Sequence, residues 1–335
     1  MLKPVFLVIL LLPFAAGTAG QAKASGDTYS VQWENDRIAK TDRHYTNGFR
    51  LSWVSEEKAS DPEWVRDLLN RIYPFAALKS GRAGAAFGQS IYTPEDTSAT
   101  ALVQNDRPYA GWLYGGISVH AETSKNADPS SLDMLDTVEL DFGIVGPYAL
   151  GKQVQNGVHE LINVANSDGW DNQLDNEPGL MLIGERRWRT APLDVMGLKL
   201  DVIPHLGGSI GNVMTFAGAG AMIRIGQELD VDFGPPLIRP SLSGLAAVEK
   251  QAEFAWYVFA GAQGRAVALD IFLDGNTFSS SHSVDKKVFV GDFQFGAAAI
   301  YRGVRLAITQ VYRTREFKQQ RQADRFGAIS LSVRF

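Results

Sequence analysis

Apolar and polar residues alternate with a period of two along much of the chain. In residues 254–265, aromatic residues, valine and alanine hold one set of alternate positions, and the other set ends in Gln263 and Arg265. In residues 304–308, valine, leucine and isoleucine alternate in the same way with Arg305 and Ala307. Successive side chains of a strand point to opposite faces, so the pattern predicts strands with one apolar and one polar face. The strands of a soluble β-sandwich show the same alternation of apolar and polar residues, so that fold is an alternative.

Counting such segments gives about twelve strands, an even number typical of single-chain bacterial outer-membrane barrels. We expect them near residues 28–36, 46–54, 84–92, 110–121, 134–145, 179–188, 198–208, 215–225, 254–273, 285–301, 302–315 and 324–335. Short helices are expected in residues 55–83 and 151–165. The prediction is therefore an all-β fold, an antiparallel transmembrane β-barrel of about twelve strands with short helices in its loops.

The N-terminus has the organisation of a secretory signal peptide. Lys3 precedes an apolar run from Val5 to Ala16, and small residues lead to the triplet Ala22-Lys23-Ala24. The apolar run is too short for a transmembrane helix, and its charged, apolar and small-residue parts follow the signal-peptide order. We expect residues 1–24 to be a removable signal peptide and residues 25–335 to form one barrel domain.

The C-terminal segment alternates up to its last residue, Phe335. A terminal strand that ends in phenylalanine resembles the signature by which outer-membrane barrels are recognised for assembly. The barrel assembly machinery is therefore an expected partner during biogenesis, and the mature protein is expected to be a monomer.

Composition removes several classes of function. The chain has no cysteine, which excludes thiol catalysis and thiolate metal sites. A net charge of −5 argues against a nucleic-acid surface.

If the N-terminus lies in the periplasm, alternate loops face the cell exterior. These are residues 37–45, 93–109, 146–178, 209–214, 274–284 and 316–323. The unusual polar clusters of the sequence lie in, or next to, the first three of these loops.

The first cluster combines Glu34-Asn35-Asp36 with Tyr45-Thr46-Asn47-Gly48. Neighbouring carboxylate and amide oxygens at a strand end suit a hard cation such as Ca²⁺. An ordinary Asx-rich turn, with Asn47-Gly48 as a tight bend, explains the same residues.

The second cluster runs from Gln89 to Pro94 and from Asp106 to Trp112. Arg107 is expected to pair with Asp106 or with an acidic loop residue. An aromatic girdle accounts for Tyr109, Trp112 and Tyr114 without any catalytic role.

The third cluster lies in the longest of these loops. On a helix, Gln155 and His159 stand four residues apart and face the same way. A single histidine is more often structural than catalytic, so His159 is a candidate that needs support from elsewhere.

Taken in order, these motifs resemble those of the LpxR-type lipid A 3′-O-deacylase family. They read E-N-D, D-R-x-Y-T-N-G, Q-x-I-Y-T-P, D-R-P-Y-A-G-W, G-x-V-G-P, Q-x-x-x-x-H and G-W-x-x-Q. The resemblance runs from about Tyr29 to Arg187 and continues more weakly to Phe335. It implies a twelve-stranded outer-membrane barrel that uses Ca²⁺ to remove the 3′-acyloxyacyl chain from lipid A of lipopolysaccharide.

The resemblance also implies roles for particular residues. His159 would act as general base on a water molecule that attacks the ester carbonyl. Asp36 would help hold the Ca²⁺ ion, Asn35 would place the metal or His159, and Thr46 would orient the water or a metal ligand.

The chain departs from the family pattern at two places. Where family members can carry a basic residue suited to a lipid A phosphate, this chain has the acidic stretch Glu95–Ala99. Where some members have a glutamate after the histidine, this chain has Ala165, with Glu160 or Asp168 as possible substitutes. Both differences weaken the lipid A assignment more than the ester-hydrolase assignment. Another acylated saccharolipid or a phospholipid therefore stays open as the substrate.

Two other functions stay open at this point. Ser118 and His120 share one face of a strand and suit a phospholipase A-like serine esterase. Alternatively the barrel is a non-enzymatic channel or structural protein, with Arg305, Arg313 and Arg315 lining a pore.

Overall fold

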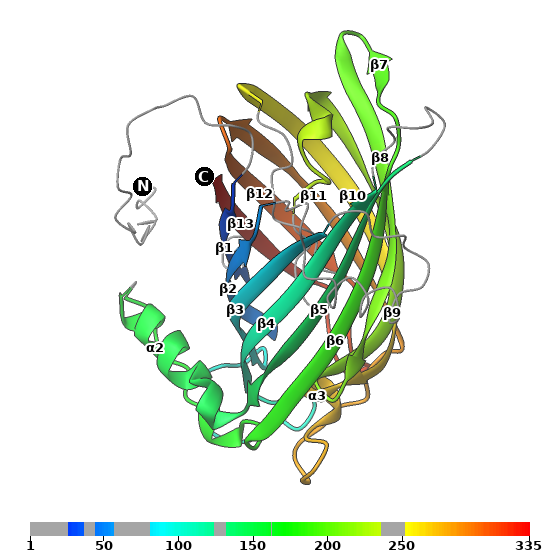
Figure 1. The fold of residues 1–335 in the computed structure, drawn as a ribbon. Coiled ribbons are helices and arrows are strands. Elements are labelled where there is room, and N and C mark those ends of the chain that lie inside the picture. Colours follow the sequence, from blue (N-terminus) through cyan, green and yellow to red (C-terminus); the bar gives the residue numbers. More distant parts are fainter. Residues whose placement is uncertain (1–25, 37–43, 57–80, 124–131, 162, 236–251) are drawn as a thin grey trace.

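The computed structural model describes residues 26–36, 44–56, 81–123, 132–161, 163–235 and 252–335. These residues form one antiparallel sheet that closes on itself (Figure 1). The signal peptide predicted in residues 1–24 and most of the helix predicted in residues 55–83 lie outside the described part of the chain.

The wall consists of long strands joined to their sequence neighbours. They are β1 (Thr28–Asn35), β2 (His44–Val54), β3 (Gly81–Thr93), β4 (Ala110–Thr123), β5 (Asp133–Val145), β6 (Glu177–Arg189), β8 (Leu198–Gly211), β9 (Met214–Gln227), β10 (Phe254–Asp270), β11 (Phe289–Tyr301), β12 (Val304–Arg313) and β13 (Asp324–Arg334). The short β7 (Leu193–Val195) pairs only with β8. The described sheet has 13 strands, and setting β7 aside leaves twelve in the wall. Pairings β1–β13 and β6–β8 close the ring, which confirms the predicted barrel.

Several strand ends differ from the prediction by a few residues, and at two of them local structure takes over. β10 stops at Asp270 rather than 273, where the Asp270 carboxylate accepts a hydrogen bond from the Phe272 amide (3.0 Å) and begins helix α3 (Ile271–Asp274). β11 starts at Phe289 rather than 285. The preceding residues pair with the loop after β12 instead, since the Lys287 amide donates to the Glu316 carbonyl (2.7 Å).

The alternation places apolar side chains outside and polar side chains inside. Phe293 and Ile308 are 58% and 53% exposed on the outer face, whereas Arg224 and Arg305 are fully buried inside. This is the expected arrangement for a barrel surrounded by lipid. None of the helices in the described residues is both long and apolar enough to cross a membrane.

The segment that follows β9 crosses the interior of the barrel. Its carbonyl at Phe233 accepts a hydrogen bond from Arg187 of β6 (3.0 Å), and the carboxylate of Asp232 pairs with Arg305 of β12 (3.0 Å). In the order of strands around the ring, β6 and β12 are nearly opposite each other. The segment therefore bridges the two sides of the lumen.

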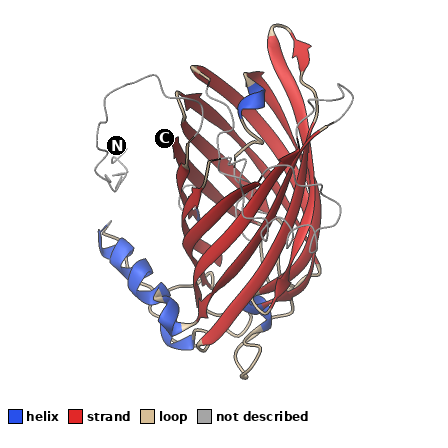
Figure 2. Cartoon of the chain, in the orientation of Figure 1, coloured by secondary structure: helices blue, strands red, loops and turns tan. Residues whose placement is uncertain are grey.

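The two ends of the barrel carry different structures. The loops after β1, β3, β5, β8, β10 and β12 share one end, called here the loop end, with helices α2 (Gly151–Leu161) and α3 (Figures 1 and 2). The hairpin of β7 and the C-terminus lie towards the opposite end (Figure 1). Apart from residues 37–43, which lie outside the described part of the chain, the loops predicted to share one side of the membrane lie at this one end.

Candidate active site

Asn35 and Thr46 meet where β1 ends and β2 begins. The register of β2 against β3 shifts between Tyr45 and Asn47, so Thr46 is the extra residue of a β-bulge. The Nδ2 atom of Asn35 donates to the carbonyl of Thr46 (3.0 Å), and the hydroxyls of Thr46 and Thr93 are 2.8 Å apart. Bulges often occur next to active sites, where they re-aim a side chain. The alternative of a tight bend at Asn47-Gly48 is wrong, because both residues lie within β2.

Asp36 follows Asn35 directly and is only 1% exposed. This end of β1 therefore gathers carboxylate, amide and hydroxyl oxygens in a buried place, and these are the donors that Ca²⁺ accepts. No group of three His, Asp or Glu side chains in the described residues is arranged to hold a metal. A cation beside Asp36 would therefore need backbone, amide and hydroxyl oxygens to complete its shell, and Asn35 and Thr46 fit that requirement.

Glu34 is fixed from two sides within the same cluster. The Tyr45 hydroxyl donates to its Oε2 atom, and the Nε2 atom of Gln32 donates to its Oε1 atom (2.5 Å). A Cβ at Gly48 would lie 2.1 Å from the Tyr45 hydroxyl oxygen. The glycine of the Y-T-N-G motif therefore leaves room for the Tyr45–Glu34 contact, a role that the sequence did not suggest.

Helix α2 confirms the helix expected in residues 151–165 and lies beside the outer wall (Figures 1 and 2). The Nε2 atom of Gln89 donates to the Ala149 carbonyl just before the helix (2.6 Å), and the Nε1 atom of Trp170 donates to Oε1 of Gln155 (3.0 Å). A Cβ at Gly151 would lie 2.5 Å from the Trp170 ring. Several motifs that carry the family resemblance are therefore the residues that attach α2 to the barrel.

His159 lies on the buried side of α2 and is 4% exposed. Its Nδ1 atom lies 2.7 Å from the carbonyl oxygen of Ala165. A carbonyl can only accept, so Nδ1 carries a proton, and the neutral form of this imidazole has its lone pair on Nε2. The Ala165 backbone thus orients the imidazole, whereas Glu160 and Asp168, the acidic substitutes considered from the sequence, are exposed and do not contact it.

Some of the predicted site residues are in contact with each other, whereas others only lie at the same end of the barrel. Asn35 and Thr46 are in contact, and Asp36 is next to Asn35 in the chain. His159 lies at the same end of the barrel, but no interaction between described side chains connects it to these three residues. Residues 37–43, which follow Asp36, lie outside the described part of the chain.

Tyr109, Trp112 and Tyr114 do not form a lipid-facing girdle. They are 2%, 3% and 3% exposed, and the Tyr109 and Trp170 rings pack with centroids 4.9 Å apart. The girdle interpretation is therefore wrong. Tyr109 helps to hold the segment that follows α2.

Comparison with known proteins agrees with this geometry. The family model described as "Outer membrane protein LpxR" matches residues 5–335. The chain belongs to the LpxR family. It is therefore a bacterial outer-membrane protein, in agreement with its barrel.

A solved LpxR structure shows the same fold. LpxR from Salmonella typhimurium is 20% identical, with a TM-score of 0.73, over 92% of this chain and 100% of that chain. The β domain of the Bordetella autotransporter BrkA is 9% identical, with a TM-score of 0.46, over 93% and 99% of the two chains. No curated protein matches the chain.

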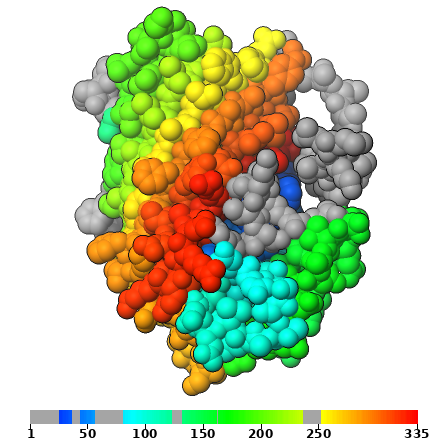
Figure 3. All heavy atoms as spheres, turned by 180° about the vertical axis from the view of Figure 1, so that it is seen from behind, coloured from blue at the N-terminus to red at the C-terminus, as the bar shows by residue number. Residues whose placement is uncertain are grey.

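In this LpxR family member, a charged network ties the loop end together. His44 contacts Asp324 through Nδ1 (2.6 Å) and Asp106 through Nε2 (3.3 Å), and Arg107 pairs with Glu316 (2.8 Å). Arg107 thus finds an acidic loop partner, as the sequence suggested. Figure 3 shows the cyan loop after β3 against the red loop after β12.

The pKa of Asp106 reflects this network. Burial acts to raise it, but the hydrogen bond and charge of His44, with amide donors from Glu95 and Arg107, hold the pKa below its ordinary value of 3.8. Asp106 therefore stays ionised to a lower pH than an unperturbed aspartate does.

The structure contains one of the two contacts that a serine esterase at Ser118 and His120 needs, and it lacks the other. The Ser118 hydroxyl lies 2.9 Å from Nε2 of His120, as their spacing predicts. The Nδ1 atom of His120, however, lies 3.1 Å from the hydroxyl of Thr137, where a serine hydrolase has a carboxylate. The pair also lies inside the barrel, towards the far end of β4 from the loop end.

The channel alternative required arginines along an open lumen. Arg305 pairs with Asp232 (3.0 Å) and Arg313 with Asp292 (2.8 Å), and both arginines are buried. Arg315 lies beyond the end of β12 and is exposed. Two of the three arginines are therefore held in buried ion pairs.

Proposed function

We propose that this protein is a Ca²⁺-dependent lipid A deacylase that hydrolyses the ester of the 3′-acyloxyacyl chain, with its loop end facing the cell exterior. The observation that carries the proposal is His159, whose Nδ1–H is bound by the Ala165 carbonyl so that Nε2 is available as a base. It lies at the same end as the buried oxygens of Asn35, Asp36 and Thr46. Membership of the LpxR family supports the choice of substrate.

The residues suggest a division of labour. Nε2 of His159 would take a proton from water as the water attacks the ester carbonyl, and would return it to the leaving alkoxide. Asp36, Asn35 and Thr46 would hold Ca²⁺, which when bound would supply positive charge to the developing oxyanion. The hydroxyl of Thr46, itself positioned by Thr93, would orient the attacking water.

The position of α2 suits a substrate that stays in the membrane. Val158 and Leu161, neighbours of His159 on the helix, are 40% and 69% exposed. Such apolar side chains beside the wall are compatible with acyl chains, and in the proposed orientation a base on this helix would act on an ester near the lipid headgroups.

Mass spectrometry of lipid A from cells with and without the protein tests the proposal. We expect loss of one acyloxyacyl chain with the wild-type protein in Ca²⁺, and no loss with a chelator. Asp36→Ala and His159→Ala should assemble but lower the rate at least a hundredfold. Asp171→Ala, an 89% exposed carboxylate near α2, is the matched control and should retain full activity. Full deacylation by both site variants would exclude this mechanism.

A further inference from the structure

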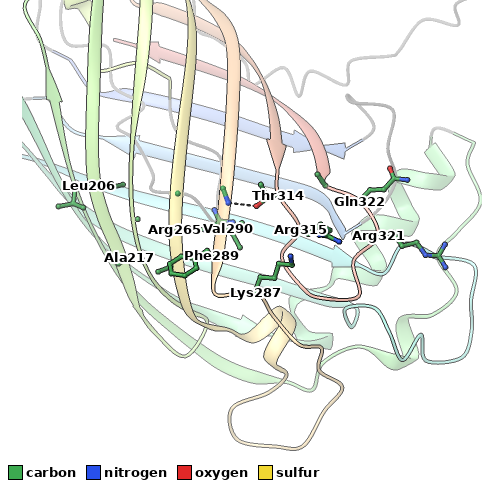
Figure 4. Close-up of a pocket in the computed structure, with 16 residues that line it drawn as sticks. Leu206, Ala217, Arg265, Lys287, Phe289, Val290, Thr314, Arg315, Arg321 and Gln322 are labelled. Carbon is green, nitrogen blue, oxygen red and sulfur yellow. Dashed lines mark hydrogen bonds between the residues drawn. The ribbon is translucent and has the colours of Figure 1, made fainter.

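A large groove lies on the outer wall, over β8 to β11 and next to the loop after β12. Its volume is about 1040 Å³, the size of a small-molecule site. Figure 4 shows its lining residues, with Leu206 towards one end and Arg321 towards the other. We call it the wall groove.

The floor of the wall groove is made of small residues that are neighbours across three strands. Gly264 of β10 pairs with Ala219 of β9 and with Gly291 of β11. In the same way, Ala266 lies next to Ala217. Because these positions point outwards, they leave a hollow between larger outward side chains, such as Leu206 (54% exposed) and Phe289 (78% exposed).

The rim of the wall groove is basic. Of the 16 lining residues, four are arginine or lysine and none is acidic. Arg265 points inwards and is paired with Asp292 (2.8 Å). Lys287, Arg315 and Arg321 have no carboxylate partner among the described residues, so their charge is available to a ligand.

Glu316, the acidic residue next to Arg315, does not neutralise this rim. Glu316 is 4% exposed, and Arg107 binds its carboxylate at 2.8 Å. Burial acts to raise the pKa of Glu316, but the charges of Arg107, Arg313 and Arg265 hold it below its ordinary value. Its negative charge is therefore balanced on the inner side of the wall.

Charge and apolar surface are ordered along the barrel axis. Lys287 precedes β11, Arg315 follows β12 and Arg321 precedes β13, so all three cations lie beyond the strand ends. The small residues of the floor lie within the strands, where the outer face meets lipid. A lipid with an anionic headgroup above its acyl chain has charge and apolar surface in the same order.

We propose that the wall groove is a second, non-catalytic site for lipid A, with its phosphates at the basic rim and an acyl chain on the floor. It is separate from His159, because α2 is attached near β3 and β4, whereas the groove covers β8 to β11 and the loop after β12. The inference rests on the proposed function for its orientation, since lipid A occupies the outer leaflet. It also provides phosphate-binding cations that the acidic stretch Glu95–Ala99 does not supply.

Native mass spectrometry of the full-length His159→Ala protein in detergent tests the groove, because this variant should bind lipid A without cleaving it. The probes are bisphosphorylated lipid A, dephosphorylated lipid A and phosphatidylglycerol. We expect two bound molecules of bisphosphorylated lipid A. Combining Lys287→Gln, Arg315→Gln and Arg321→Gln should weaken one of them on the order of a hundredfold, at about fivefold for each cation. Lys318→Gln, which removes an exposed lysine paired with Asp285, should change nothing.

A second variant fills the floor instead of changing the charge. A Cβ at Gly264 meets no protein atom within 4 Å, and the same is true of Gly184 on β6. Both positions therefore have open space where a side chain would begin. Gly264→Phe should remove the same lipid A molecule, whereas Gly184→Phe should retain it.

The outcomes separate this inference from the proposed function. One bound lipid A that disappears in the rim and floor variants would support the groove even if no deacylation occurs. Binding that is unchanged in both variants would overturn it. Binding of phosphatidylglycerol or dephosphorylated lipid A as tight as that of bisphosphorylated lipid A would also overturn it, because the rim would then not select lipid A phosphates.

Discussion

Thr46 is the extra residue of a β-bulge in β2, and the bulge sets the direction of its side chain. Without the register shift between Tyr45 and Asn47, strict alternation would give neighbouring residues opposite faces. The bulge lets Tyr45 contact Glu34 while Thr46 contacts Thr93. Two consecutive side chains are thereby buried at the start of the same strand.

Replacing Thr46 by valine tests whether its hydroxyl is used in the reaction. Thr46→Val keeps the branched shape and removes only the oxygen, so the barrel should assemble normally. We expect the rate of lipid A deacylation to fall by about tenfold to a hundredfold. Thr309→Val, at a buried threonine of β12, is the control and should keep its activity. Equal rates for Thr46→Val and wild type would remove Thr46 from the mechanism.

The sequence predicted Asn35 and Thr46 as site residues but did not reveal the groups that contact them. Thr93 was visible at the end of the I-Y-T-P motif, yet its contact with Thr46 depends on the register of two strands. The Ala165 carbonyl, which orients His159, gives no signal in the sequence because every residue has a carbonyl. Side-chain types can be read from motifs, whereas backbone partners require the fold.

At the scale of elements, α2 is held by a few specific contacts. Its end near the wall is fixed by Gln89 and by the ring of Trp170, and the indole N–H of Trp170 is bound by Gln155. The helix contributes little to the closed ring of strands. Its position can therefore be changed without opening the barrel.

Gln155→Leu should loosen α2 selectively. It leaves the buried Trp170 N–H without its acceptor, at a local cost of about 1–3 kcal/mol. We expect faster proteolysis within α2 and slower deacylation, with an unchanged thermal transition of the barrel. Gln153→Leu, on the exposed side of the same helix, should behave as wild type. A lowered barrel transition in Gln155→Leu would contradict this view of α2.

The loop-end network should depend on pH. The folded-state pKa of Asp106 is below its ordinary value of 3.8, so its stabilising effect is complete above that value and is lost as the pH falls through the folded pKa. Thermal unfolding in detergent should show lower stability at a pH of about 3 than at pH 7. Asp106→Asn should reduce that difference, and Asp171→Asn should leave it unchanged. An equal acid response in wild type and Asp106→Asn would rule out this contribution.

The strands were predictable because alternation is strong where one face meets lipid and the other meets a polar interior. Their ends were less so. The loss of residues 285–288 from β11 depends on backbone pairing with the loop after β12, and no local pattern announces it. The buried state of Trp112 and Tyr114 was likewise not predictable, since aromatic residues are also common on the outer rim.

At the scale of the whole molecule, the segment after β9 bears on whether the lumen can serve as a channel. Asp232 is fully buried and pairs with both Arg224 (2.6 Å) and Arg305 (3.0 Å). It therefore stabilises charges from two separate parts of the wall. A segment that crosses the lumen and is held by buried ion pairs disfavours the open channel.

Asp232→Ala should lower the free energy of unfolding by about 3–5 kcal/mol, because it leaves two buried arginines without this carboxylate. The temperature at which the electrophoretic mobility changes from that of the folded to that of the unfolded protein is a suitable measurement, with Asp194→Ala at an exposed carboxylate as control.

The wild-type protein should give no steady conductance in planar bilayers. Steady conductance would favour the channel alternative.

The seam between β1 and β13 constrains how the protein can be made. The hydroxyls of Ser30 and Ser332, 302 positions apart in the chain, are 2.9 Å apart across it. Until they meet, the first and last strands each have an unpaired edge, which hydrocarbon cannot hydrate. Insertion into the bilayer and joining of the seam are therefore expected to be one coupled event. A chain cut short before its final strand would lose the whole cylinder rather than one twelfth of it.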